Sequence, residues 1–369
     1  MKQGWEYKKI GNICNITTGK LDANAANEDG LYPFFTCSRI PLSINTYAYD
    51  CECILIAGNG DLNVKYYNGK FNAYKRTYIL QLKNNVNGVE MRYIFAFFNL
   101  YIEELRRKSI GGIIKYIKLG DLTNALLPLP DITTQLSIVS ELDKINELIR
   151  LKQEQLKDYD NLAQSIFYEM FGDPVENEKG WEVKKIGEIG SVERGAGISK
   201  KDFVEDGLPC IHYGQLHTIL GARTKKHYTS IPHDLLPKYK VAHTGDLVMA
   251  ITSEDVEGSC KSTAWLGNYD VIVGSDAAIL HHEQDGTFLS YYTMTKAFYN
   301  EKAKYAKGFK VTHISTKEIE KISVFLPPLP LQHLFAQRIE QIERQKSAVQ
   351  KSITDLETIL ASRMQYWFE

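Results

Sequence analysis

The chain has 369 residues, of which 44% are hydrophobic and 24% charged, and its formal net charge is −1. This length can bury more than one sizeable core; no apolar run is long enough to span a bilayer and no apolar signal core opens the sequence, so we expect a cytoplasmic protein. The six cysteines contain no Cys-x-x-Cys pair, and Cys51 and Cys53 are too close for a zinc knuckle, so we expect reduced thiols.

The near-neutral total hides an uneven distribution of charge. Residues 65–118 carry eleven Lys/Arg against three Asp/Glu, residues 296–310 carry five lysines against one glutamate, and residues 131–171 carry four Lys/Arg against eight Asp/Glu. A charge run is commonly only a solvated face. However, an excess of eight positive charges (11 − 3) within residues 65–118 also suits a polyanionic partner. The 22 tyrosines add side chains suited to binding surfaces.

The first element of the chain recurs about half a chain later. Residues 5–11 and residues 181–187 share the motif Trp-Glu-x-Lys-Lys-Ile-Gly, at an offset of 176. From Gly111 onward the matching offset is 197, so Gly111 corresponds to Gly308, and the second copy is longer by 21 residues (197 − 176) in its middle. This period is too long for a solenoid repeat. It predicts two domains with one plan and different middles.

Each globular part is predicted to be mixed and rich in strands. Short runs of β-branched and apolar residues predict strands, and a turn is predicted at Gly58-Asn59-Gly60-Asp61. The expected strands are Cys53–Ala57, Thr77–Leu82, Asp246–Ile251 and Ala277–Leu280, and the expected helices are Arg92–Lys108 and Leu289–Ala306. A glycine follows each helix, and a loop then leads to the long helices described next.

The stretch from Ser137 to Met170 is a predicted long helix. Its seam positions recur three and four residues apart without a break, and Lys152 is the charged residue among them. This spacing predicts a heptad seam with one flaw. Asp131 or Thr133 can cap its start, and Gly172 can end it.

The C-terminal segment repeats this seam from Ile339 to Trp367, with Pro330 in its first turn. Neither helix is apolar all round, so each stripe needs a partner, and the natural partner is the other copy. The alternative is that each stripe packs on its own globular domain. If the copies pair as equivalent halves, they run antiparallel, and we expect Trp367 and Phe368 near the Met1–Trp5 segment.

Several motifs carry a family resemblance. They are the openings at 5–11 and 181–187, the Leu-Pro-Leu-Pro…Gln segment at 127–135 with its counterpart at 326–332, the junction at 167–174, and residues 32–38 and 55–60. Together they resemble the specificity subunit of type I restriction–modification systems, over essentially the whole chain. The resemblance implies an α+β fold: two mixed α/β target recognition domains joined by two long helices that pair as an antiparallel coiled coil, with pseudo-two-fold symmetry. The expected boundaries are 1–128 for the first domain, 129–172 for the central helix, 173–328 for the second domain and 329–369 for the C-terminal helix.

The resemblance also implies a function. It indicates a subunit that binds double-stranded DNA sequence-specifically, reads a split site, and directs two methyltransferase subunits and motor–nuclease subunits to it. It implies no catalysis and no cofactor in this chain, with S-adenosylmethionine, ATP and Mg on the partner subunits, and no membrane contact. The residues agree: the only Pro-Pro is at 327–328, outside any methyltransferase Asn/Asp-Pro-Pro-aromatic loop, and a Walker loop is absent. A self-contained restriction or modification enzyme and a coiled-coil scaffold that binds no DNA are the alternatives.

Candidate DNA contacts are polar and cationic residues near strand ends and loops. Lys75-Arg76-Thr77 beside Tyr74 suit phosphate contact and base stacking, and Asn59 suits the edge of an adenine. A solvated strand start and an ordinary turn are the alternatives at these two places. The full set is Asn59, Asp61, Lys65, Tyr74, Lys75, Arg76, Thr77, Lys115, Tyr116, Arg194, Lys200, Lys201, His212, Tyr213, Thr252, Ser253, Lys307, Lys310 and His313.

Overall fold

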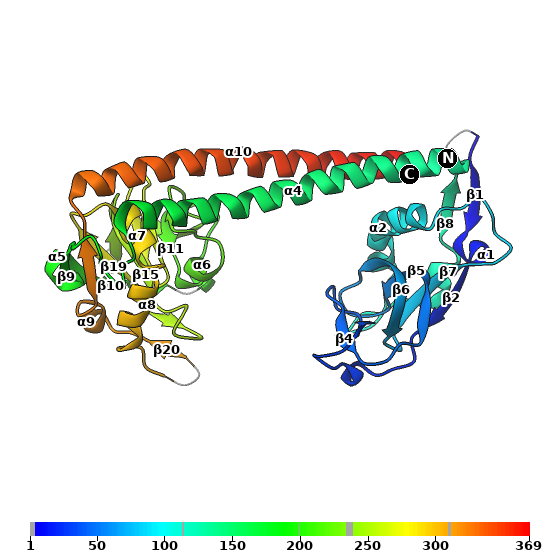
Figure 1. Cartoon of the computed structure of the whole chain (residues 1–369), viewed down its shortest axis with the longest axis horizontal. Helices are drawn as coiled ribbons and strands as arrows, with labels where there is room; N and C mark the ends of the chain where they lie inside the picture. The colour runs from blue at the N-terminus through cyan, green and yellow to red at the C-terminus, as the bar shows by residue number, and fades with distance from the viewer. Residues whose placement is uncertain (1–3, 113, 199, 234–238, 309–310) are drawn as a thin grey trace. The chain divides into compact units, whose positions relative to one another are not determined.

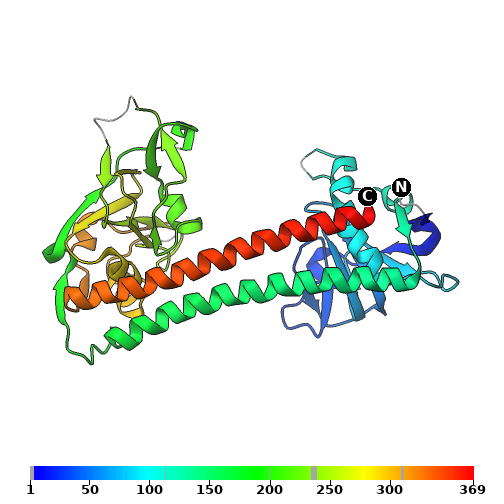
Figure 2. The same cartoon turned by 90° about the horizontal axis from the view of Figure 1, so that it is seen from above.

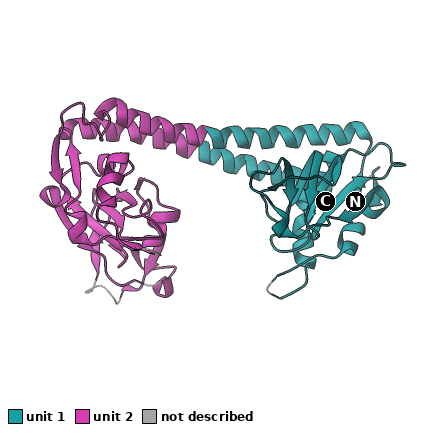
Figure 3. Cartoon of the chain, turned by 60° about the horizontal axis from the view of Figure 1, so that its bottom comes forward, with its two compact units in different colours: residues 1–154, 349–369 teal, residues 155–348 magenta. Residues whose placement is uncertain are grey.

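The computed structural model describes residues 4–112, 114–198, 200–233, 239–308 and 311–369. The chain forms two compact units (Figure 3): unit 1 comprises Met1–Glu154 with Val349–Glu369, and unit 2 comprises Gln155–Ala348. Each unit therefore combines one globular part with segments of both long helices.

All six cysteines are free thiols. Over the described ranges, no helix is both long and apolar enough to cross a membrane.

The globular part of unit 1 is a six-stranded sheet with a helix packed on it (Figure 1). Its strand order is β2-β7-β5-β6-β3-β4, and neighbouring strands are antiparallel except β3 and β6. The elements are β1 (Glu6–Lys9), α1 (Ile10–Ile13), β2 (Cys14–Thr18), η1 (Ala23–Ala25), β3 (Tyr32–Phe35), β4 (Leu42–Ile44), β5 (Tyr49–Ala57), β6 (Val64–Ala73), β7 (Thr77–Leu82), α2 (Met91–Lys108), α3 (Leu119–Thr123) and β8 (Leu126–Leu129).

Helix α2 closes the core of unit 1. Tyr93 and Phe98 of α2 are completely buried in one cluster with Ile54 of β5 and Leu80 of β7. The strands β5 and β7 and the helix α2 therefore confirm the elements predicted at Cys53–Ala57, Thr77–Leu82 and Arg92–Lys108.

Unit 2 repeats this plan with additions. Its sheets have the orders β10-β19-β15-β17-β12 and β13-β11-β18-β14, and β11 lies parallel to β18 as β3 lies parallel to β6. The elements are β9 (Glu182–Lys185), α5 (Ile186–Ile189), β10 (Gly190–Arg194), η2 (Lys200–Asp202), β11 (Leu208–Ile211), α6 (Tyr213–Thr218), β12 (Arg223–Thr224), β13 (Thr229–Ile231), β14 (Lys240–Ala242), β15 (Leu247–Ala250), β16 (Thr252–Ser253), β17 (Ser262–Trp265), β18 (Val271–Val273), β19 (Ala277–His282), α7 (Gly286–Tyr292), α8 (Lys296–Ala303), β20 (Thr312–His313), α9 (Thr316–Ile319) and β21 (Ser323–Leu326).

Two features distinguish unit 2 from the sequence prediction and from unit 1. The helix predicted at Leu289–Ala306 is wrong as a single element, because α7 ends at Tyr292 and α8 begins at Lys296. The Thr295 hydroxyl accepts a hydrogen bond from Phe298 N and so starts a new helix. In addition, α6 and β12 lie between β11 and β13, where unit 1 has only the short connection from β3 to β4, so part of the extra length of the second copy is located here.

The repeated openings pair with the proline-marked strands that precede the long helices. In unit 1, β1 is antiparallel to β8, with Glu6 opposite Leu129; in unit 2, β9 is antiparallel to β21, with Glu182 opposite Leu326. In each unit, the repeated opening motif and the repeated segment before the long helix therefore form one small two-stranded sheet.

The long helices are α4 (Ile132–Phe171) and α10 (Leu329–Phe368). Asp131 caps α4, since its carboxylate accepts a hydrogen bond from Thr134 N at 3.0 Å. Gly172 ends it, because its positive φ of 78° places it in the left-handed region that stops a helix. Both signals were predicted.

A buried glutamine ties the start of each long helix to its globular part. Gln135 donates to the carbonyls of Pro130 (2.8 Å) and Gly88 (2.9 Å) and accepts from Glu90 N (3.0 Å), just before α2. Gln332, at the offset of 197, donates to Pro327 O (2.8 Å) and accepts from Asp285 N (3.0 Å), just before α7. Both side chains are fully buried.

The two long helices pair in an antiparallel sense. In unit 1, Leu142 near the start of α4 shares a core cluster with Phe368 at the end of α10. In unit 2, Phe167 near the end of α4 packs on Phe335 near the start of α10, with ring centroids 5.6 Å apart. Figures 1 and 2 show these neighbouring segments within each unit. The predicted antiparallel coiled coil is confirmed, and each helix also contacts a globular part.

The predicted meeting of the chain's two ends is also present within unit 1. Trp367 stacks on Trp5, and Phe368 packs on Tyr93 of α2 with centroids 5.1 Å apart. Residues 1–3 of the predicted contact lie outside the described residues.

Candidate nucleic-acid interface

Three segments of unit 1 that are distant in sequence meet through backbone hydrogen bonds. Gly58 N, after β5, donates to Arg76 O, before β7, at 2.8 Å, and Ile117 N, after α2, donates to Gly58 O at 3.0 Å. Asn59 then forms an antiparallel bridge with Tyr116. We call this meeting point, with Asn59, Arg76 and Tyr116, the first junction.

Unit 2 builds the same backbone frame from corresponding residues. Ile251 N donates to Asp276 O at 3.0 Å, and Ile314 N donates to Ile251 O at 3.1 Å. Thr252 of β16 lies opposite His313 of β20. This is the second junction, with Thr252, Asp276 and His313 in the places of Asn59, Arg76 and Tyr116.

A glycine shapes the turn that carries the last residue of each junction. Ile110 and Tyr116 exchange two backbone hydrogen bonds (3.0 and 2.8 Å), as Lys307 and His313 do (3.1 and 2.8 Å). Within these turns Gly111 and Gly308 have φ values of 120° and 127°, and a Cβ would lie 2.6 and 1.9 Å from a backbone carbonyl oxygen. Only glycine fits there without movement of the turn.

The first junction carries cations that no carboxylate among the described residues neutralises. Arg76 and Lys118 line a cleft of about 540 Å³ together with Tyr78 and Tyr116. In the part of unit 1 that the structure describes, Arg76, Lys115 and Lys118 have no ion-pair partner, and all three are exposed. The predicted residues Asn59, Arg76, Lys115 and Tyr116 are thus brought together at one surface.

Other cations around the first junction are paired. Lys75 contacts Asp22 at 2.5 Å, and Arg39 contacts Asp61 at 2.7 Å. The hydrogen bond from Arg39 holds the pKa of Asp61 below its usual value. Arg106 of α2 also contacts Asp61 (3.5 Å) and donates to Leu62 O at 2.8 Å, which fixes the turn after β5. Sequence reasoning missed Arg39 and Arg106, because no local pattern links them to Asp61.

Three further predicted residues of unit 1 lie beside the junction or inside the fold. Tyr74 is half-buried and forms a bridge with Leu21, and Lys65 is half-buried and donates to Asn63, with a pKa lowered by burial. Thr77 is 1% exposed, and its hydroxyl donates to Phe35 O at 3.2 Å. The structure therefore gives the Thr77 side chain a role in the fold, because its position on the inward face of β7 removes it from any surface.

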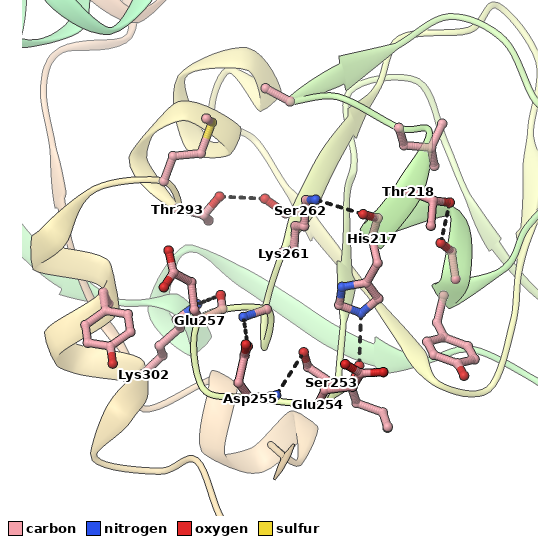
Figure 4. A pocket seen from close by; sticks show the side chains of 18 of the residues that line it. His217, Thr218, Ser253, Glu254, Asp255, Glu257, Lys261, Ser262, Thr293 and Lys302 are labelled. Atoms are coloured by element: carbon pink, nitrogen blue, oxygen red, sulfur yellow. Dashed lines mark hydrogen bonds between the residues drawn. The ribbon is translucent and has the colours of Figure 1, made fainter. Parts of the chain in front are cut away.

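The second junction borders a larger cleft in unit 2, of about 1340 Å³ (Figure 4). Its lining includes the predicted residues Tyr213, Thr252 and Ser253. The Thr252 hydroxyl hydrogen-bonds His313 Nδ1 at 3.0 Å, and His217 Nε2, a residue that sequence reasoning missed, hydrogen-bonds Thr252 O at 3.1 Å. Four of the predicted residues thus meet at one place.

A buried lysine holds one wall of this cleft. Lys302 is 4% exposed, and its ammonium donates to Glu257 O at 2.7 Å and Ser259 O at 2.5 Å. Burial lowers the pKa of Lys302. Lys302 therefore fixes the loop between β16 and β17. This loop carries Glu254, Asp255 and Glu257, which line the cleft in Figure 4.

Of the remaining predicted residues of unit 2, two form ion pairs within the unit. Arg194 contacts Asp276 (3.7 Å) and donates to Ser275 O (2.7 Å), and Lys307 pairs with Glu318 at 2.6 Å. Lys200 and Lys201 are exposed in η2, and Lys310 lies outside the described residues.

His212 corrects the sequence prediction. It is 9% exposed, and its Nδ1 accepts a hydrogen bond from Gly214 N at 3.2 Å, so the ring caps the start of α6. Burial lowers the pKa of His212, which keeps the ring neutral and able to accept this bond. The structure assigns His212 to the fold, whereas its neighbour Tyr213 reaches the cleft.

The His281-His282 pair offers no assembled metal site. His281 Nδ1 bonds to Asp246 at 2.8 Å. Over the ranges that the structure describes, no group of three or more His, Cys, Asp or Glu side chains is arranged to hold a metal ion.

Comparison with known proteins identifies the family. A model of the type I restriction modification DNA specificity domain matches residues 2–158 and 178–358. The chain belongs to this family. Its two matched segments each contain one opening motif and one junction, so the duplication seen in the sequence is a duplication of the specificity domain.

Relatives and solved structures of type I systems are similar over nearly the whole chain. The type I restriction enzyme EcoDI specificity subunit of Escherichia coli is 26% identical, over 95% of this chain and 84% of its own length. The MjaVIII specificity subunit of Methanocaldococcus jannaschii is 23% identical, over 92% and 86%. The S subunit from M. genitalium has a TM-score of 0.57 at 13% identity, covering 100% of this chain and 98% of that one. A chain from a study of complex assembly and conformational transition of the type I R-M system has a TM-score of 0.58 at 19% identity, covering 100% and 98%. These structures share the fold of this specificity subunit.

Proposed function

We propose that this specificity subunit binds duplex DNA through its two junctions, so that each unit reads one half of a split site. The observation that carries the proposal is the shared frame of the junctions. The frame consists of backbone hydrogen bonds and is the same in both units, whereas the side chains that it presents differ. A protein that must read two different base sequences needs this combination, because the backbone sets the reach and side chains read base edges.

The charges of the first junction support contact with DNA. Arg76, Lys115 and Lys118 are exposed and lack carboxylate partners among the described residues, so their donors are available to DNA. Tyr116 is 39% exposed beside them and offers an aromatic face. Lys75 adds a further cation, because its exposed pair with Asp22 is easily exchanged for a phosphate.

We further propose that the subunit acts with methyltransferase and motor–nuclease subunits and carries no catalytic centre. In this proposal, S-adenosylmethionine, ATP and Mg are bound by those partners. Support comes from the relatives, which are named as subunits of restriction enzymes. Exposed leucines on α4 add to it: Leu136, Leu148 and Leu151 are 50%, 47% and 46% exposed. Exposed apolar side chains on a helix fit a protein partner that covers them.

Methylation mapping tests the proposal. Genomic DNA from the host is sequenced for modified bases, with and without the gene for this chain. We expect one motif, made of two specific parts separated by an unspecific gap, to lose its methylation when the gene is deleted. Unchanged methylation, or loss of a short continuous motif, would contradict the proposal.

Two measurements on the purified chain separate the alternatives. If it is a self-contained modification enzyme, the chain alone transfers labelled methyl groups from S-adenosylmethionine to DNA. If it is a coiled-coil scaffold without DNA binding, it binds no duplex at any salt concentration, even with methyltransferase subunits present. We expect neither result.

A further inference from the structure

The backbone of Arg76 in the first junction is held in place by hydrogen bonds. Its carbonyl oxygen accepts hydrogen bonds from Gly58 N (2.8 Å) and from the Cys37 thiol (3.6 Å), and the next residue, Thr77, is buried. The side chain is exposed at the rim of the cleft. A guanidinium held at a fixed origin loses less freedom on binding than one on a mobile loop.

The donors of Arg76 are unoccupied within the described structure, unlike those of the neighbouring arginines. Arg39 and Arg106 both contact Asp61, and Arg106 also donates to the backbone. Arg76 has no such partner among the described residues, and neither do Lys115 and Lys118. Of these three cations, only the arginine has a planar fork of donors that can bond two acceptors at once.

Unit 2 has the opposite charge at the same place. The bond from Gly58 N to Arg76 O corresponds to the bond from Ile251 N to Asp276 O, so Asp276 takes the position of Arg76. The nearby arginine of unit 2, Arg194, comes from a different strand and is bound to Asp276 and Ser275.

This reversal of charge distinguishes between phosphate contact and base reading as the role of Arg76. Phosphates are the same in every half-site, so a residue needed for phosphate contact would keep its charge in both units. Base edges differ between half-sites, and a position that reads them changes with the sequence. Replacement of a cation by an anion on the same backbone frame therefore favours base reading at Arg76 over phosphate contact.

We propose that Arg76 reads a guanine in the half-site bound by unit 1, by donating two hydrogen bonds to its N7 and O6 atoms. Guanine is the base that presents two acceptors side by side in the major groove, and this pair matches the guanidinium fork. The proposal rests on the proposed function, since it requires that unit 1 binds a DNA half-site through the first junction.

The test uses the complete system in its host, with wild type, Arg76→Ala, Arg76→Lys and the control Arg92→Ala, which removes an arginine that pairs with Asp143 of α4. In wild type we expect a required guanine in one half-site. Arg76→Ala relaxes that position, with discrimination against other bases falling on the order of tenfold to a hundredfold. Arg76→Lys keeps only part of the preference for guanine, because an ammonium can also donate to N7 and O6 but lacks the planar fork. Arg92→Ala keeps the motif, and the second half-site stays unchanged in every variant, which shows that the subunit is folded.

If a variant stops methylation altogether, a binding measurement tests whether Arg76 reads the guanine. Two duplexes compete for binding to the complex purified from the host. One carries guanine at the required position, and the other carries 7-deazaguanine, which lacks the N7 acceptor. Wild type should prefer guanine on the order of tenfold, and Arg76→Ala should not discriminate.

Two results would overturn the assignment while leaving the proposed function intact. They are a split motif without a required guanine and equal binding of both duplexes by wild type. Absence of any split motif in wild type would instead overturn the proposed function itself.

Discussion

The indole ring of Trp367 stacks on that of Trp5, with centroids 6.2 Å apart and planes 4° from parallel. Trp367 Nε1 also donates to Glu141 Oε2 at 3.0 Å, and Glu141 in turn accepts a hydrogen bond from Arg363. The hydrogen bond from Arg363 lowers the pKa of Glu141. The end of α10 is thereby joined both to the start of the chain and to α4.

Removing this stack should weaken unit 1. Trp367→Ala loses aromatic packing and the hydrogen bond to Glu141, and we expect the free energy of unfolding to fall by about 2–4 kcal/mol. Ile359→Ala, at a residue of α10 that is 48% exposed, is the control and should change it by less than about 1 kcal/mol. Urea titration measures both. Equal effects of the two variants would show that the stack does not stabilise the unit.

The buried glutamines should be needed for each long helix to dock. Gln332→Leu leaves Asp285 N and Pro327 O without their partner in a buried place, so we expect a loss of about 2–4 kcal/mol. The equivalent change Gln135→Leu should cost unit 1 a similar amount. Leu334→Ala, on the exposed side of α10, serves as the control. Thermal unfolding of the three variants provides the comparison, and wild-type stability in either glutamine variant would contradict the expectation.

Glu318 should give unit 2 a pH dependence in the acid range. It accepts hydrogen bonds from Lys307, at 2.6 Å, and from the backbone and hydroxyl of Ser315, and these bonds lower the pKa of Glu318 to about 2. Because the folded pKa lies below the unfolded one, the carboxylate stabilises the fold above its ordinary pKa of about 4.3 and loses this effect as the pH falls toward 2.

Comparison of wild type with Glu318→Gln isolates this group. The difference between their free energies of unfolding should be constant above about pH 5 and shrink steadily below it. Denaturant titrations at a series of pH values give the difference directly. A difference that stays constant down to pH 2 would mean that the contacts with Lys307 and Ser315 do not exist in solution.

Lys75 should contact phosphate. In Lys75→Ala the slope of log affinity against log salt concentration should fall by about 0.9, the value for one lost phosphate contact on duplex DNA. The control is Arg92→Ala, which removes a cation paired with Asp143 of α4 at the start of α2 and should leave the slope unchanged. An unaltered slope in Lys75→Ala would place this side chain off the DNA.

The paired helices should set the gap of the recognised site. Adding one heptad after Leu156 and one after Ile353 preserves both seams and lengthens each helix by about 10 Å. At 3.4 Å per base pair, this change corresponds to a gap wider by about three base pairs. The two half-sites should be unchanged, because the junctions are untouched. Methylation mapping would show the new motif, and recovery of the original gap with full activity would mean that the helices do not set it.

The fold followed from the sequence where the signal was local or repeated. Runs such as Ile54–Ile56 predict buried strands, and the heptad seam predicts α4, because periodicity is written directly into neighbouring residues. The break between α7 and α8 was missed, although Thr295 is an ordinary capping residue, because the apolar pattern on both sides continues through it.

The candidate site was predictable only in part. The named residues of the junctions, except Asp276, stood out by type, but their meeting depends on backbone bonds between segments far apart in sequence, such as Gly58 with Arg76 and Ile117. Thr77 could have been excluded, since strand alternation places it on the same buried face as Ile79. The Asp61 contacts of Arg39 and Arg106 had no signal, because ion pairs between distant elements follow no periodicity.

The frame of the junctions has a consequence for how such a protein changes over generations. Because main-chain atoms hold the three segments together, substitutions at Asn59, Arg76 or Tyr116 leave the scaffold bonds in place. The same is true of Thr252, Asp276 and His313 in the other unit. Under the proposed function, a point mutation in one unit would change the half-site read by that unit and leave the other half-site unaltered.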